Sequence, residues 1–243
     1  MDKLIFTAVS GAERLMRAQQ VHANNLANLD TSGFRASMEV ASSLPLNAKS
    51  YGYDDAHLST QQADAISTRA GGIRETGRPL DVAIGGQGYL AVQYGDGEAY
   101  TRAGEIEIGP EGALSVHGHP LLGEGGAIVL PPHTAVEIGT DGTVSVLTEG
   151  ATQMQVVDKL RLVNAESAEL SKNEAGLIVP RTGGTLPADP AVKVRPRALE
   201  GSNVSAVEEM VATMNLSRSF EMQMRLFKAS DGMDEAANRL VGG

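Results

Sequence analysis

The C-terminal segment carries the pattern that most constrains this chain, a helical repeat too long for one small domain to bury. Ser205 and Glu208 have the spacing of a capping box, which predicts a helix start there. Farther along, apolar side chains recur by fours and threes, the spacing of a coiled-coil seam: Met222, Leu226, Ala229, Met233, Ala236 and Leu240. One helix over residues 203–240 would be about 57 Å long. We therefore predict that this helix lies along a partner.

The N-terminal segment shows a second helical stripe, made mostly of small side chains. Apolar or small residues recur by threes and fours from Ile5 to Leu26, which predicts one helix. Turn-forming residues at positions 28–34 predict its end, where Gly33 is free to adopt a positive φ. Because a narrow face of small residues packs readily against another helix, we expect this stripe to contact the C-terminal seam.

The stretch between the two helices changes to a β pattern. From residue 77 to about residue 197, short runs of Val, Ile, Leu and Tyr alternate with glycine turns, which is typical of antiparallel sheets. Residues 80–84 and 89–94 flank a glycine-rich turn at residues 85–88, and a second turn follows at residues 95–97; this pattern predicts hairpins. Residues 106–116 and 136–146 align as a weak internal repeat of strand, turn and strand.

The predicted fold class is therefore α+β. N- and C-terminal α-helices are expected to pair as a coiled-coil-like layer and to flank a central, mostly antiparallel β-domain. The pattern divides the chain into an N-terminal helical assembly segment at 1–35, a linker at 36–76, a central β-rich domain at 77–200 and a C-terminal helical assembly segment at 201–243. The linker is predicted from its scarcity of large apolar side chains.

Composition and charge exclude several function classes. The chain has no cysteine, so it forms no disulfide and carries no thiol nucleophile or thiolate metal site. Its net charge is −10, most of it in residues 36–200, which disfavours nucleic acid and anionic lipid as partners. No run approaches the roughly 18 apolar residues of a membrane span, and the N-terminus lacks a signal pattern. We expect neither membrane insertion nor a cleaved signal peptide.

The residues that most resemble a reactive site have simpler interpretations. The glycine-rich turn at residues 85–88 lacks the lysine of a phosphate-binding loop, so an ordinary turn is favoured. His117, His119 and His133 stand among turn residues, with no carboxylate spaced to complete a metal site. Neither a nucleophile motif nor a pair of carboxylates on one element occurs. We therefore expect no catalytic, cofactor-binding or metal-binding residues, and no enzymatic activity.

Three asparagines, Asn24, Asn25 and Asn28, stand in a segment otherwise suited to a helix. Asparagine prefers turns and caps, so one interpretation is a fraying helix end. The other, which we favour, is that these amides bond across a helix–helix or subunit interface and fix its register. The methionines of the last helix, such as Met210 and Met214, likewise fit either core packing or an adaptable surface.

Residues 23–35 read Ala-Asn-Asn-Leu-Ala-Asn-Leu-Asp-Thr-Ser-Gly-Phe-Arg. This motif closely resembles the N-terminal signature of bacterial flagellar rod and hook proteins. The resemblance continues through residues 76–84, 99–102 and 138–145 and ends in residues 199–211, so it covers both ends and the centre of the chain. Within the family, residues 33–36 and 218–223 look most like those of a proximal rod protein.

The resemblance implies a structural subunit of the proximal rod in the flagellar basal body, spanning the periplasm, with no cofactor and no small-molecule substrate. Implied partners are other proximal and distal rod proteins, further copies of this chain, and the flagellar type III export apparatus. Two alternatives stay open, a distal rod protein of the same family and a non-flagellar coiled-coil scaffold or adhesin. The residues expected at the assembly interface are Ile5, Ala8, Ala12, Leu15, Asn24, Asn25, Leu26, Asn28, Gly33, Phe34, Asn203, Val207, Met210, Met214, Met222, Leu226, Met233 and Leu240.

Overall fold

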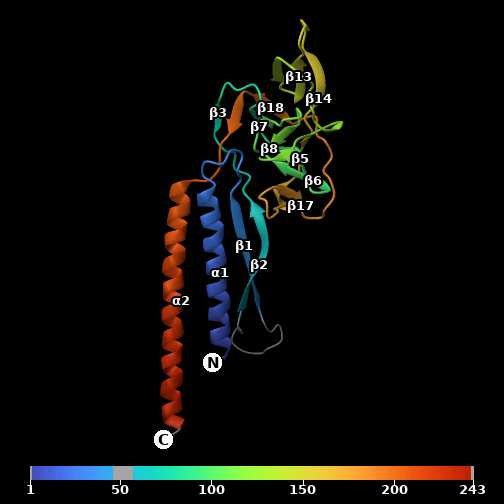
Figure 1. Ribbon diagram of the computed structural model, residues 1–243. Coiled ribbons are helices and arrows are strands. Elements are labelled where there is room, and N and C mark those ends of the chain that lie inside the picture. The colour runs from blue at the N-terminus through green and yellow to red at the C-terminus, as the bar shows by residue number, and fades with distance from the viewer. Residues whose placement is uncertain (1, 46–56, 242–243) are drawn as a thin grey trace. The chain divides into compact units, whose positions relative to one another are not determined.

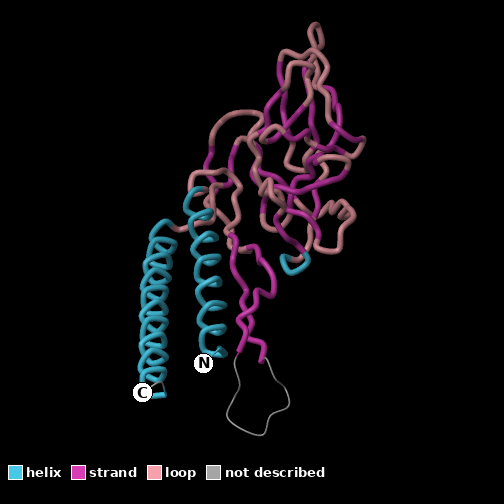
Figure 2. The backbone as a smooth tube through the Cα atoms, turned by 60° about the horizontal axis from the view of Figure 1, so that its bottom comes forward, coloured by secondary structure: helices cyan, strands magenta, loops and turns pink. Residues whose placement is uncertain are grey.

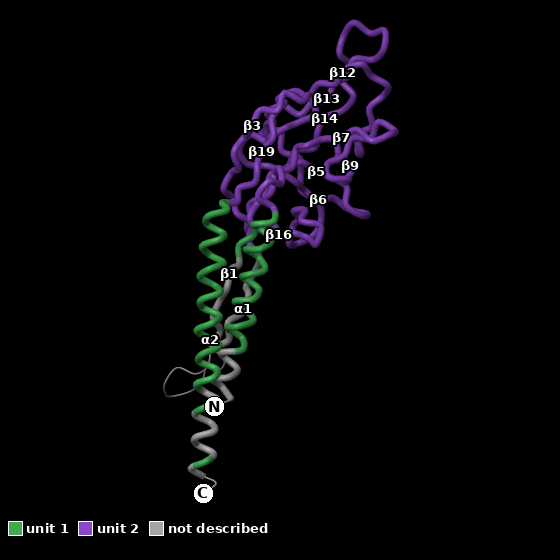
Figure 3. Tube along the Cα trace, turned by 60° about the vertical axis from the view of Figure 1, so that its left-hand side comes forward, with its two compact units in different colours: residues 1–27, 37–64, 205–243 green, residues 28–36, 65–204 purple. Residues whose placement is uncertain are grey.

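The chain separates into two compact units in the computed structural model, which describes residues 2–45 and 57–241 (Figure 1). Unit 1 comprises Met1–Ala27, Ser37–Asp64 and Ser205–Gly243, and unit 2 comprises Asn28–Ala36 and Ala65–Val204 (Figure 3). Unit 1 contains the two α-helices, whereas unit 2 consists of short strands and loops with one 3-10 helix (Figure 2).

Unit 1 is built from helices α1 (Asp2–Ala27) and α2 (Ala206–Val241) and from most of a two-stranded sheet. Strands β1 (Ser37–Pro45) and β2 (His57–Ile66) form that sheet, and β1 runs beside α1 (Figure 1). The segment predicted as a linker, residues 36–76, thus includes both strands. The predicted start of the C-terminal helix is confirmed, since Ser205 Oγ accepts a hydrogen bond of 3.4 Å from the Glu208 backbone N–H.

The prediction of a coiled-coil-like layer formed by the two helices is wrong. The described residues contain just two α-helices, and most regular elements are short strands in seven small sheets. The predicted seam residues Met222 and Leu226 are 59% and 68% exposed, so their side chains do not pack against α1. Instead Gly11 of α1 lies against the side chain of Gln223 in α2. A glycine facing a polar amide offers no apolar knob and hole, so these positions cannot form the predicted seam.

Unit 2 is a set of small, mostly antiparallel sheets. The largest has the strand order β15-β5-β6-β17-β16, and two others have the orders β12-β13-β14 and β7-β8-β9. The remaining elements of the unit are β3 (Ile73–Glu75), β4 (Val82–Gly85), β5 (Tyr89–Tyr94), β6 (Gly97–Thr101), β7 (Ile106–Ile108), β8 (Leu114–Val116), β9 (His119–Pro120), β10 (Leu122–Gly123), β11 (Gly126–Ala127), β12 (Ala135–Ile138), β13 (Thr143–Leu147), β14 (Gln155–Lys159), β15 (Leu162–Val163), η1 (Ser167–Glu169), β16 (Leu170–Lys172), β17 (Ile178–Pro180), β18 (Lys193–Pro196) and β19 (Ala198–Glu200).

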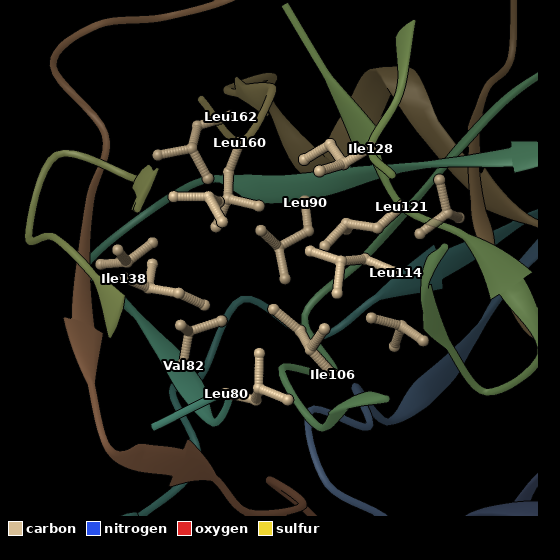
Figure 4. Close-up of a cluster of buried hydrophobic side chains, with 14 of the residues drawn as sticks. Leu80, Val82, Leu90, Ile106, Leu114, Leu121, Ile128, Ile138, Leu160 and Leu162 are labelled. Carbon is tan, nitrogen blue, oxygen red and sulfur yellow. The ribbon is translucent and has the colours of Figure 1, made fainter. Parts of the chain in front are cut away.

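The predicted internal repeat is confirmed as two antiparallel hairpins. β7 pairs with β8, and β12 pairs with β13 at the equivalent register, so that Ile106 lies opposite Val116 and Val136 opposite Val146. Both hairpins contribute buried side chains to the core of unit 2, which the strand pair β5–β6 also lines (Figure 4). The alternation of apolar and polar residues in these strands therefore has the usual cause, one face on the core and one in solvent.

Of the predicted hairpins, the one across residues 95–97 is confirmed as the antiparallel pair β5–β6, and the one over residues 80–94 is wrong. β4 pairs with β18, not with β5, and Lys193 lies opposite Gly85. At the turn between β4 and β5, the guanidinium of Arg102 donates hydrogen bonds to the carbonyls of Ile84, Gly86 and Gly88. Because a side chain satisfies these carbonyls, the two strands need not pair with each other.

Candidate assembly interface

Helix α2 exposes a row of large apolar side chains. Val207, Met210, Val211 and Met214 recur by three and four positions, which places them on one helix face, and all four are exposed. Met222 and Leu226 continue the exposed row toward the C-terminus. Soluble proteins rarely leave many large apolar groups in water on one element, so such a row marks an interaction surface. Of the other predicted residues of this segment, Met233 and Leu240 lie outside those whose side chains are described.

The predicted residues of α1 have several different environments. Leu15 is buried, Ala12 and Leu26 are half-buried, and Asn24 is exposed. Ile5 and Ala8 lie outside the residues whose side chains are described. Among the residues whose side chains are described, Ala12, Leu15 and Leu26 share one face of α1 and are buried or half-buried, whereas Asn24 is exposed.

Asn25 is the polar centre of unit 1, with only 1% of its surface exposed. Its amide nitrogen donates to the Ser37 carbonyl at 3.0 Å and to Glu209 Oε1 at 3.1 Å, and its amide oxygen accepts from the Ser37 N–H at 2.9 Å. His22 binds the other carboxylate oxygen of Glu209. Asn25 thus links α1 to both β1 and α2. Asn28 belongs to unit 2, where its side chain accepts a bond from the Thr31 hydroxyl at 3.1 Å in the turn after α1.

Within unit 2, the segment that follows α1 is bonded to the segment that precedes α2. The Gly33 N–H donates to the Glu200 carbonyl at 2.7 Å, and the Asn203 N–H donates to the Phe34 carbonyl at 3.2 Å. The Ala36 N–H donates to the side-chain oxygen of Asn203 at 2.7 Å. The predicted residues Gly33, Phe34 and Asn203 are therefore brought together, but inside the unit.

A buried charge cluster completes this junction. Glu200 accepts hydrogen bonds from Arg35 at 2.8 Å, from Arg102 at 2.6 and 2.7 Å, and from the Gly71 N–H at 2.9 Å. The side chains of Arg35, Arg102 and Glu200 are only 5%, 3% and 2% exposed. We call the cluster of Gly33, Arg35, Arg102, Glu200 and Asn203 the clasp. Burial lowers the pKa of the Arg35 guanidinium, and the nearby charge of Arg102 lowers it further, against the opposing effect of Glu200.

Two residues of the clasp region show why the local sequence takes this shape. Gly33 has φ of 67°, which confirms the predicted positive φ, and a Cβ at this position would collide with the backbone of Arg102 and Ala103. The ring of Phe34 lies under the ammonium group of Lys172, 3.9 Å from the ring centroid. Burial lowers the pKa of Lys172 to about 8. Both motif residues thus serve packing within unit 2.

Sequence reasoning missed Arg35, Arg102 and Glu200 as members of the site. Each stands in a stretch that also carries family-like motifs, yet their partners are far apart in the chain, with Arg102 and Glu200 separated by 98 positions. The local signal that could have found them is a charged residue inside an otherwise small and apolar stretch. Such a signal indicates burial without identifying the partner.

The histidines His117 and His133 lie in turn and loop segments of unit 2. His117 and Gly118 form the turn between β8 and β9, with φ of 49° and 79°, and His133 bonds to the nearby Pro131 carbonyl. Within residues 2–45 and 57–241, no cluster of three His, Cys, Asp or Glu side chains is arranged to hold a metal ion. In that same part of the chain, neither helix is apolar enough over a sufficient length to cross a membrane.

Comparison with protein families and known proteins finds matches along the chain. Residues 5–35 match the flagella basal body rod protein family, residues 83–146 the flagellar hook protein FlgE/F/G D1 domain, and residues 195–240 the flagellar basal body rod FlgEFG protein C-terminal family. The flagellar basal-body rod proteins FlgF of Salmonella typhimurium and Escherichia coli are each 38% identical to it over 250 aligned positions, covering 99% of both chains. The rod protein FlgG of Buchnera aphidicola is 29% identical and covers 92% of this chain and 95% of its own.

Proposed function

Because this chain belongs to the FlgF family of flagellar basal-body rod proteins, we propose that the exposed apolar row of α2 is the surface by which it assembles. The protein is a structural component of the proximal rod of the flagellar basal body, and it assembles with other rod proteins. The observation that carries this conclusion is the 38% identity to FlgF relatives over 99% of both chains. FlgG, the family alternative considered from the sequence, matches at 29% identity over 92% of this chain.

The assembly surface is proposed from exposure and chemistry. The apolar row of α2 includes five of the residues expected at the interface, all of them exposed: Val207, Met210, Met214, Met222 and Leu226. Removing such side chains from water against neighbouring subunits would contribute about 25 cal/mol per Å². Methionine side chains also adapt to neighbours that differ in shape, as the several proteins of a rod do. In this proposal residues 1–35 and 201–243 are the assembly segments, residues 77–200 form the β-rich domain and residues 36–76 link it to the first segment.

Other predicted interface residues have a different proposed role. Asn25, Gly33 and Asn203 are buried and bonded within their own unit. We propose that they shape the subunit and that neighbouring subunits do not touch them. Substitutions at these positions should therefore reduce the stability of the isolated protein, whereas substitutions in the apolar row should not.

The finer aspects of location and partners are also proposals. We infer that the chain contacts further copies of itself in the rod, that it is exported by the flagellar type III apparatus, and that it assembles in the periplasm. The family resemblance of both terminal segments supports this. In cells that lack a functional export apparatus the protein should remain in the cytoplasm. Its appearance in the periplasm of such cells would contradict the proposed export route.

A gene deletion tests the function directly. Basal bodies isolated from the deletion strain should lack the rod beyond the membrane ring, with no hook or filament, and a plasmid copy should restore them. Intact basal bodies on motile cells would contradict the function, provided that the genome carries no second copy. In that case the non-flagellar scaffold or adhesin would become the leading interpretation.

Two matched variants test the surface. Leu226→Asp in α2 and Val156→Asp in β14 each replace an apolar residue that is 68% exposed with one that carries a carboxylate. Both purified proteins should unfold like the natural protein. Only Leu226→Asp should fail to restore rods in the deletion strain, because only that carboxylate would be buried against neighbouring subunits. Normal rods with Leu226→Asp, or equal loss with both variants, would refute the proposed surface.

A further inference from the structure

The clasp of unit 2 is buried and carries a net positive charge. Two guanidiniums, those of Arg35 and Arg102, share the single carboxylate of Glu200, and all three side chains are nearly inaccessible to water. Burying a charge is costly unless it is paired and hydrogen-bonded. Removing one partner of a buried ion pair is strongly destabilising, because it leaves an uncompensated charge buried. Glu200 is therefore the group on which the stability of this cluster depends.

Glu200 also accepts hydrogen bonds from backbone groups of two distant segments, the turn after α1 and the loop at residues 71–72. Its side chain accepts from the Gly71 N–H at 2.9 Å, and its backbone carbonyl accepts from the Gly33 N–H at 2.7 Å. The next residue along the chain, Gly201, donates to the Gly72 carbonyl at 2.8 Å. Without the carboxylate, the Arg35 guanidinium in the segment after α1 would lose its ion pair, and the Gly71 N–H in the loop at residues 71–72 would lose its hydrogen bond.

Asn203 closes the same junction from the other side. Its side chain accepts from the Ala36 N–H at 2.7 Å and donates to the Arg69 carbonyl at 2.7 Å. Its backbone N–H donates to the Phe34 carbonyl at 3.2 Å. These bonds form only when residues 33–36, 69–72 and 200–203 are all in place. The three segments come from distant parts of the chain, so local structure cannot order any one of them alone.

We propose that Glu200 is a closing counter-ion, which makes the two terminal edges of unit 2, residues 28–36 and 198–204, fold together in one step. Arg35 also donates to the carbonyls of Thr68 and Arg69, but until Glu200 reaches the two arginines the segment after α1 lacks the counter-charge of its buried guanidinium. Order at the exit from one helix therefore requires order at the entry to the other. This inference concerns the folding of unit 2 and does not depend on the proposed function.

Amide hydrogen exchange of the full-length protein, followed by NMR, tests this coupling. In Glu200→Gln, which keeps the shape but removes the charge, the amides of Gly33, Ala36, Gly71 and Gly201 should all exchange faster by more than about a hundredfold. The control is Glu124→Gln, since Glu124 is exposed and lies 3.8 Å from Lys159. That substitution should change exchange by less than about threefold. Equal protection in Glu200→Gln and the natural protein, or loss at one edge only, would overturn the proposal.

A double variant distinguishes the effect of the lost charge from the effect of a changed side-chain shape. Arg35→Gln combined with Glu200→Gln returns the net charge of the cluster to that of the natural protein. The loss of protection in the double variant should therefore be smaller than the product of the two single losses. A loss equal to that product would overturn the role of charge. Should Glu200→Gln alone not fold, recovery of folding in the double variant supports the proposal, and failure of both variants to fold refutes it.

Discussion

Replacing Gly33 with alanine tests whether the turn after α1 is shaped by the close packing seen in unit 2. Gly33 and Gly77 both have positive φ, 67° and 75°, so alanine is conformationally unfavourable at either position. At Gly77 the added Cβ meets nothing within 4 Å, whereas at Gly33 it would collide with the backbone of Arg102 and Ala103. Gly77→Ala is therefore a matched control, because it measures the cost of placing alanine at a positive φ without any steric collision.

The expected difference follows from these contacts. An L-residue in the left-handed region costs about 1–2 kcal/mol, and the stiffer unfolded chain returns about 0.4–1 kcal/mol of this. Gly77→Ala should therefore destabilise unit 2 by about 0–1.6 kcal/mol. Gly33→Ala adds about 1–3 kcal/mol for overpacking and about 1 kcal/mol for the lost hydrogen bond to Glu200. Its total cost should be about 4 kcal/mol.

Urea unfolding monitored by tyrosine fluorescence measures this difference. The chain has no tryptophan, and three of its five tyrosines, Tyr89, Tyr94 and Tyr100, belong to unit 2; Tyr89 and Tyr100 are buried there, so the change in their emission on unfolding reports on that unit. With a slope of about 2 kcal/mol per molar urea, the midpoint should fall by about 2 M in Gly33→Ala and by less than about 0.8 M in Gly77→Ala. Equal midpoints for the two variants would show that the contact between Gly33 and the Arg102 backbone does not constrain the fold.

Further substitutions test the roles of buried and conformationally restricted residues in both units. Asn25→Ala should destabilise unit 1 by about 2–3 kcal/mol, because it leaves buried groups unpaired; a thermal melt of the helices by circular dichroism measures this, and an unchanged melt would contradict it. Leu90→Ala should cost about 2–5 kcal/mol in the same urea assay, since Leu90 is fully buried. His117→Asn should stabilise unit 2 slightly, because asparagine tolerates the positive φ of this turn better. Burial lowers the pKa of Lys172 from 10.5 to about 8, so the unfolded chain binds more protons between these values, and the free energy of unfolding should rise from pH 8 to 9.5. Lys172→Met should remove that rise, and a slope that persists in the variant would refute the assignment.

Features that depend on neighbouring residues could be predicted from the sequence. The stripes of α1 and α2, the Ser205 cap, the positive φ of Gly33 and the repeated hairpins each follow from side chains a few positions apart. Local geometry and hydrophobic periodicity suffice for such elements. The family resemblance was equally visible, since it lies in short motifs at both ends of the chain and in its centre.

The tertiary structure alone decided which elements meet. The periodicity of α2 predicted an apolar seam, but a repeat cannot tell whether its side chains meet the same chain or stay exposed, and here Met222 and Leu226 are exposed. The same limit applies to β4, which pairs with the distant strand β18, while Arg102 satisfies the carbonyls of the turn after it. It applies most strongly to the clasp, where Glu200 compensates two arginines that are far from it in sequence. Long-range pairing is set by the burial and charge balance of the folded chain, and no window of neighbouring residues contains that information.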